Sequence, residues 1–317
     1  MNLQFSGLHH VSALSADIAK NHDFYTRVLG LRLVKKTVNQ DSPSMYHLFY
    51  ADGAGSAGSD MTFFDFPRAA REHRGNDSIS LTTFRVTGRA ALEFWAERLA
   101  QFGVQHSGIH TADGRERLDF EDVDGTRLAL IDDGGQGPRG VPNPKTDLPA
   151  EMQLQGLGYS GFTVANLAPT SEFLERGLNM REVRHYLAGG FKTHVFEMGE
   201  GGPSAELHVT ERGDLPKHRA GAGGVHHVAL RMKDEAELAL WLAHLEAQGY
   251  GNSGHIDRHF FHSVYIREPN GLVIELATDG PGFATDEMPD ALGERLSLPP
   301  FLEPRRATIE AHIRPLV

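Results

Sequence analysis

A short phrase occurs twice in this chain, near the start and far downstream, and each copy opens the same structural pattern. Residues 7–11 read Gly-Leu-His-His-Val, and residues 224–228 read Gly-Val-His-His-Val. In each copy an aspartate, Asp17 or Asp234, soon follows and precedes apolar residues at helical spacing. The repeat predicts a duplicated strand-helix unit, with the two histidine pairs at equivalent positions.

Each unit continues with segments that predict strands. The first predicts a strand at 7–14, a helix from Asp17 to Gly30, and strands at 31–39, 44–50 and 60–66. The last unit, 225–278, repeats this order, with a helix from Asp234 to Gly249 and strands near 260–267 and 271–278. Weaker copies lie at 79–132 and 156–211. We therefore expect an α+β protein made of four βαβββ modules.

A segment rich in glycine and proline separates the second module from the third. Such a composition is typical of an exposed connection. We therefore expect modules one and two within 1–132, a linker at 133–150, and modules three and four within 151–280. Residues 281–317 carry several prolines and predict an irregular C-terminal tail.

The net charge and the absence of cysteine restrict the kinds of partner and site that the protein can have. A net charge of -11 disfavours nucleic acid and anionic membranes, which attract clustered Lys and Arg. The chain has no cysteine, which excludes disulfides, thiolate metal sites and cysteine nucleophiles. Its first residues do not resemble a secretory leader, and no apolar run is long enough for a membrane span. We expect a cytoplasmic protein with small-molecule partners; association into a homo-oligomer is left open.

Strand alternation selects one histidine from each pair. Val228 and Leu230 share a face with His226 and suit a helix-covered core, which leaves His227 on the opposite, concave face. The same alternation selects His10 in the first copy. Glu275 follows a Pro-Asn-Gly turn on an otherwise apolar strand, where a buried carboxylate needs a partner. His10, His227 and Glu275 therefore predict a facial metal triad.

These motifs, over residues 7–278, resemble the vicinal-oxygen-chelate superfamily of glyoxalase I, fosfomycin-resistance proteins and extradiol dioxygenases. The resemblance implies modules paired into two cup-shaped, barrel-like domains, with His10, His227 and Glu275 as metal ligands. The doubled histidines, together with Arg258 and Tyr265, make the chain similar to the hydroquinone ring-cleaving dioxygenases of this superfamily.

That similarity implies a small aromatic substrate, either a hydroquinone or a catechol, and dioxygen. The metal it implies is Fe(II), for which two imidazoles and one carboxylate are a known ligand set, and Mn(II) suits the same ligands. It also implies that Tyr265 hydrogen-bonds a substrate oxygen and that Arg258 stabilises negative charge. His9 and His226 are candidates to orient the substrate or to carry protons; alternatively they only bond backbone or water.

The middle modules lack the motif residues. Ala129 stands where the last module has Glu275, and Gly158-Tyr159 replaces the histidine pair. We therefore expect modules one and four to form the metal-binding cup and modules two and three a supporting one.

Two other functions remain open at this point. A glyoxalase-I-like isomerase would need a fourth protein ligand, for which Asp60 and Asp65 lie on the corresponding strand but outside a matching motif. A non-enzymatic member of the superfamily would sequester an aromatic molecule. The intact triad argues against such a binding protein.

Overall fold

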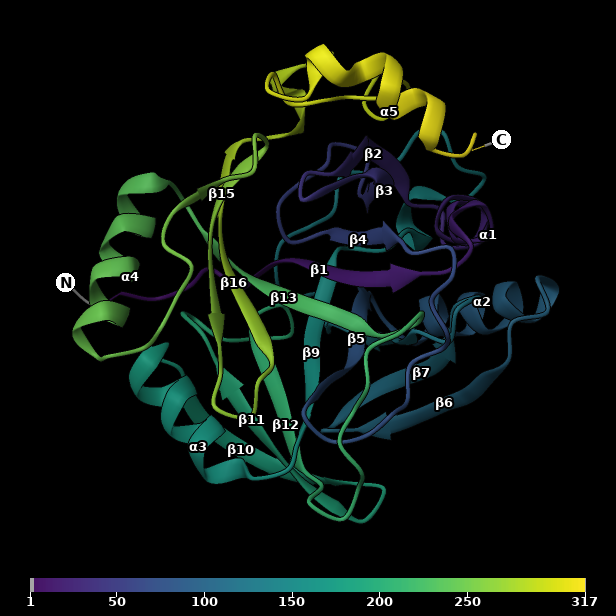
Figure 1. Ribbon diagram of the computed structural model, residues 1–317. Helices are drawn as coiled ribbons and strands as arrows, with labels where there is room; N and C mark the ends of the chain where they lie inside the picture. Colours follow the sequence, from purple (N-terminus) through teal and green to yellow (C-terminus); the bar gives the residue numbers. More distant parts are fainter. Residues whose placement is uncertain (1–2, 317) are drawn as a thin grey trace.

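The protein contains two curved, eight-stranded sheets in the computed structural model, which describes residues 3–316 (Figure 1). The first sheet has, in spatial order, β14 (Ile256–Asp257), β15 (Phe261–Arg267), β16 (Val273–Pro281), β13 (Val225–Met232), β1 (Leu8–Ser15), β4 (Asp60–Asp65), β3 (Ser42–Ala51) and β2 (Arg32–Asn39). The second has β10 (Arg181–Ala188), β11 (Phe191–Glu197), β12 (Glu206–Glu211), β9 (Leu157–Val164), β5 (Ser78–Val86), β8 (Arg127–Asp132), β7 (Arg115–Glu121) and β6 (His106–Ala112).

Four helical segments occur, one after the first strand of each module. They are α1 (Ile18–Asp23) with the π-helical turn η1 (Phe24–Val28), α2 (Arg89–Gln101), α3 (Leu167–Glu172) with η3 (Phe173–Gly177), and α4 (Glu235–Ala247). Asp17 and Asp234 cap α1 and α4 by accepting backbone N–H bonds, as their positions predicted. No helix in the described part of the chain is both long and apolar enough to cross a membrane.

The predicted elements and their order are confirmed, with strand ends displaced by a few residues. Strands of modules one and four share the first sheet, and strands of modules two and three share the second. The fold is therefore the expected pair of cups. Each sheet takes strands from both sequence halves, so the division at 133–150 stays a prediction about chain order.

The centre of the first sheet joins the two repeated motifs. Strands β1 and β13 are antiparallel, with Val11 opposite Val228, and each also has a parallel neighbour, β4 and β16 respectively. The side chains of Val11 and Val228 are fully buried in the hydrophobic core that the two sheets and the helices share. The opposite face of these strands thus carries the second histidine of each pair, as the alternation predicted.

The C-terminal tail covers the outer side of β2 and β3 (Figure 1). It includes η4 (Phe283–Thr285), η5 (Glu303–Arg305) and α5 (Arg306–His312); the remaining short turn, η2 (Ala150–Met152), precedes module three. Leu298, Leu302 and Ile309 pack on Val38. The Nζ of Lys35, whose side chain is fully buried, lies 2.5 Å from Glu287 and 2.7 Å from Asp286. Apolar packing and a buried ion pair therefore both attach the tail to module one.

Candidate metal centre

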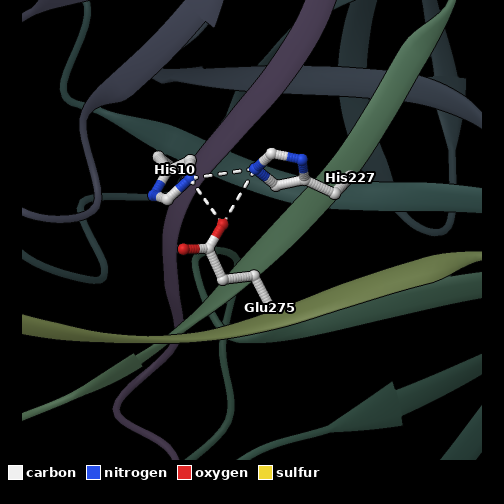
Figure 2. Close-up of side chains that lie close together, drawn as sticks. All are labelled: His10, His227 and Glu275. Carbon is white, nitrogen blue, oxygen red and sulfur yellow. Dashed lines mark hydrogen bonds and ion pairs between the residues drawn. The ribbon is translucent and has the colours of Figure 1, made fainter. Parts of the chain in front are cut away.

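Three side chains from three strands converge in the first cup (Figure 2). His10 lies on β1, His227 on β13 and Glu275 on β16. The Nε2 atoms of His10 and His227 are 3.2 Å apart. Glu275 Oε2 lies 3.1 Å from the first nitrogen and 2.8 Å from the second. The residues predicted as the triad thus direct one ligand atom each toward a common point.

The spacing of these atoms fits one face of an octahedral ion. Nitrogen and oxygen ligands lie about 2.0–2.2 Å from a metal such as zinc, so neighbouring ligands at right angles are about 3.0 Å apart. A tetrahedral site of the same size would separate them by about 3.4 Å. The observed separations of 2.8 to 3.2 Å match the right-angled arrangement. That arrangement leaves three further positions on the ion for other ligands.

The charge of the centre also fits a cation. Glu275 is fully buried, and its Oε2 has no hydrogen-bond donor among the described residues although both imidazole nitrogens lie close. Burial opposes ionisation of this carboxyl, but His10 and His227 in their protonated forms outweigh that effect and hold its pKa well below its usual range; a bound cation would supply the same positive charge once the rings are neutral. Burial lowers the pKa of His227, which favours the neutral imidazole that metals bind. A metal ion would therefore contact an ionised carboxylate, and its positive charge would offset the free-energy cost of burying that negative charge.

His9 also faces the centre, contrary to regular strand alternation. The pairing of β1 with β13 shifts register between Leu8 and His10, as in a β-bulge, and such irregularities re-aim side chains. His9 Nε2 donates to the carbonyl of Thr278 (3.1 Å), so its neutral Nδ1 accepts from His10 Nδ1 (2.9 Å). Burial, followed by nearby His10, lowers the pKa of His9 to about 3 and keeps the ring neutral. This contact leaves His10 Nε2 free to bind a metal.

The second motif repeats the arrangement. The register of the same strand pair shifts again between Ser12 and Ala13, opposite the stretch from His227 to Val225. His226 Nδ1 lies 2.7 Å from His227 Nδ1, and burial, followed by His227, lowers the pKa of His226 to about 4. With His227 Nδ1–H as the donor, its Nε2 would be free for a metal. Both candidate histidines thus contact a ligand ring, and His226 also lines the cavity described next.

Arg258 and Tyr265 lie in the wall of a cavity that opens onto the triad. The cavity has a volume of about 640 Å³ and is lined by residues of modules one and four, among them the aromatic side chains of Phe49, Phe64 and Phe261. Arg258 Nε donates to the hydroxyl of Tyr265 (3.2 Å). Burial, followed by the charge of Glu275, raises the pKa of Tyr265, so its hydroxyl stays protonated. Its proton is then free to point toward a bound molecule.

Two further residues at the centre were missed by the sequence analysis. Ser263 on β15 is fully buried and donates a short hydrogen bond to Glu275 Oε1, which orients the carboxylate. It lies two residues before Tyr265, and strand alternation therefore places both on one face. His47 on β3 lines the cavity beside Phe64. No repeated motif marks either residue, but alternation from Tyr265 was a usable signal for Ser263.

Thr62 lies at the position in module one that corresponds to Glu275 in module four. In module four, Glu275 pairs with Ala229, which lies two residues after His227. In module one the equivalent pairing joins Thr62 to Ser12, which lies two residues after His10. Neither Asp60 nor Asp65 occupies that position. The structure therefore offers a hydroxyl where a glyoxalase-I-like isomerase would need a carboxylate.

The second cup holds a network of charges where the first has its triad. Asp113, Glu206 and His208 place potential ligand atoms close together. However, Arg115 donates to both oxygens of Glu206 (2.6 and 2.7 Å), and Arg184 binds Glu206 and Asp113. Burial opposes ionisation of Glu206, but hydrogen bonds from Arg115 and His208 outweigh it and lower its pKa. Guanidinium groups already neutralise these carboxylates, so the cluster is a poor cation site.

The paired cups and their residues place the chain in a known family. Residues 7–130 and 156–276 match the model of the Glyoxalase/Bleomycin resistance protein/Dioxygenase superfamily. The chain belongs to this superfamily. The solved structure of glyoxalase I from Zea mays has the same fold, with a TM-score of 0.61 at 13% identity over 86% of this chain and 92% of that one.

More similar relatives carry dioxygenase names. The chain is 48% identical to the ring-cleaving dioxygenase MhqA of Bacillus subtilis, over 99% of this chain and 100% of that one. It is 28% identical to a chlorohydroquinone/hydroquinone 1,2-dioxygenase of Sphingobium indicum, over 94% and 92% of the two chains. A crystal structure of a Bacillus subtilis protein, described as a dioxygenase, has a TM-score of 0.90 at 30% identity and covers 98% of this chain and 97% of that one.

Proposed function

We propose that the protein is an extradiol-type dioxygenase that opens the ring of a hydroquinone, or of a catechol, and inserts both atoms of dioxygen. The observation that carries the proposal is the convergence of His10, His227 and Glu275 at right-angle ligand spacing below an aromatic cavity. The names of the relatives support ring cleavage. The ligand set suits Fe(II), with Mn(II) as the alternative.

Fe(II) held by His10, His227 and Glu275 would supply open positions for a phenolic oxygen and dioxygen, and would conduct electrons from the substrate to dioxygen. The remaining tasks fall to the chain itself. His9 and His226 keep the ligand rings in the tautomer that presents Nε2. Tyr265, held by Arg258, donates a hydrogen bond to a substrate oxygen, and the guanidinium favours negative charge on that oxygen. The aromatic walls exclude water and seat the ring.

The most direct test is to measure dioxygen consumption by protein reconstituted anaerobically with Fe(II). Methyl- and chloro-hydroquinones are offered beside simple catechols, with bound metal measured first. Rapid uptake with one group supports the proposal and selects the substrate class. Absence of uptake with every phenol, at stoichiometric bound metal, would overturn it in favour of an isomerase; absence of bound metal would favour a binding protein.

A variant pair ties that activity to the centre. His227→Ala removes one ligand, and we expect both bound Fe(II) and dioxygen uptake to be lost. His185→Ala is the control, because His185 is exposed on the second sheet. Retained uptake in His227→Ala would refute the ligand role.

A further inference from the structure

His47 stands in the half of the cavity that module one builds. It projects from β3 and is packed against the rings of Phe49 and Phe64, each with its centroid 4.1 Å away. Its Nε2 lies 2.9 Å from Thr62 Oγ1, which lies 2.7 Å from Ser12 Oγ. Two aromatic rings and a hydroxyl pair therefore fix the orientation of this imidazole.

The position of His47 corresponds to that of Ser263 in the other half of the cup. Ser263 is paired with the residue two beyond Glu275 on the neighbouring strand, and it bonds Glu275. His47 is paired with Phe64, two beyond Thr62, and it bonds Thr62. One half of the cup thus directs a carboxylate to the metal. The other replaces the carboxylate by a hydroxyl and adds a longer, nitrogen-bearing side chain.

The second ring nitrogen of His47 is left for a ligand. Nδ1 makes no hydrogen bond to any residue in the described part of the chain, and the side chain lines the cavity. Burial, followed by His10 and His227, lowers the pKa of His47, so the ring is neutral and Nδ1 either accepts or donates. An unpaired imidazole nitrogen between two phenyl rings is suited to a polar group carried on a flat, apolar molecule.

Arg258 and Tyr265 occupy the opposite, module-four half. The Tyr265 ring lies 5.7 Å from that of His227, so these two residues suit oxygens gathered beside the metal. A hydroquinone carries its second hydroxyl at the opposite ring position, and that hydroxyl calls for a further polar contact in the cavity. His47 from module one and the Arg258–Tyr265 pair from module four therefore offer two separate polar contacts to a molecule in the cavity.

We propose that His47 is a specificity-determining residue, whose Nδ1 hydrogen-bonds the substrate hydroxyl that the metal does not hold. The inference rests on the proposed function for the phenolic nature of the ligand. It assigns the choice of a ring with two opposed hydroxyls to module one, through the chain Ser12, Thr62 and His47.

Binding without turnover tests this assignment. Hydroquinone and 4-methylphenol, in which a methyl group replaces the second hydroxyl, are titrated calorimetrically into Fe(II)-loaded protein under nitrogen. We expect the wild type to prefer hydroquinone by about 10- to 100-fold, the range of one buried hydrogen bond. His47→Phe keeps a ring between Phe49 and Phe64 without nitrogen, and should lose that preference while it retains affinity for 4-methylphenol.

Two further variants keep the test decisive. Thr62→Val removes the hydroxyl that holds the imidazole and should partially reduce the preference for hydroquinone over 4-methylphenol. His47→Gln keeps a polar side chain and should show part of the preference that His47→Phe loses. They decide the matter where His47→Phe fails to fold or to bind iron. An unchanged preference in His47→Phe, or in the other two variants, would overturn the role of His47 and leave ring cleavage intact. A preference that depends on His47 without dioxygen uptake would instead refute only the proposed reaction.

Discussion

Replacing Ser263 with alanine probes how the protein prepares its carboxylate ligand. Ser263 is fully excluded from solvent, and its hydroxyl donates a hydrogen bond to Glu275 Oε1. A hydrogen bond to an ionised group contributes about 1.5–3 kcal/mol, which corresponds to about 10- to 150-fold in a binding constant. Part of this loss also affects the metal-free protein. We therefore expect Fe(II) or Mn(II) affinity to fall about 10- to 100-fold, the usual effect of losing a ligand's hydrogen-bond partner.

Anaerobic metal titration against a chelator of known affinity measures the change. Ser78→Ala is the matched control, because Ser78 is a buried serine of the second sheet whose hydroxyl donates to the carbonyl of Gly75 (2.9 Å). It reports the loss of a buried hydroxyl far from the centre. Metal affinity of Ser263→Ala within twofold of the wild type would refute the reasoning that this bond prepares Glu275.

Two predictions concern stability. Lys35→Met leaves the buried Glu287 with the more distant Arg295 (4.0 Å) as its cation and should lower the free energy of unfolding in urea by about 3 kcal/mol, whereas Lys36→Met, at an exposed ammonium, should change it little. Equal losses of stability in the two variants would contradict the stabilising role of the buried ion pair. Burial raises the pKa of Asp122 to about 6 from 3.8. The folded state then keeps a proton that the unfolded state releases, so stability should fall by about 2 kcal/mol as the pH rises from 4 to 6. Asp122→Asn should remove that fall, and an unaltered profile would contradict it.

The convergence of the three candidate ligands was within reach of the sequence, because it follows from repetition and strand alternation. The doubled motifs place His10 and His227 at equivalent points, and apolar neighbours such as Val228 fix the face that each side chain takes. Glu275 was identified because a carboxylate on an apolar strand needs a partner. The pairing of modules one and four followed from the absence of these residues in the middle modules.

The residues around the ligands were less accessible. Alternation places His9 and His226 on the face opposite the triad, and only the register shifts bring their rings against His10 and His227; a β-bulge in such a strand leaves no mark in a single sequence. His47 and Thr62 acquire meaning only when β3 and β4 are aligned with β15 and β16. That alignment requires the register of both hairpins. Their catalytic and binding roles stay predictions until the variants are measured.

The long chain separation between the triad residues also governs when the candidate metal centre can form during synthesis. His10 and His227 are 217 residues apart, and the last ligand, Glu275, comes later still. Domains on the ribosome generally fold as their segments emerge, at about 5–20 residues per second. Here β1 is made first but waits for β13 and β16 as partners. A nascent chain therefore has no complete triad until Glu275 has been translated, and a metal ion would find all three candidate ligands only after that point.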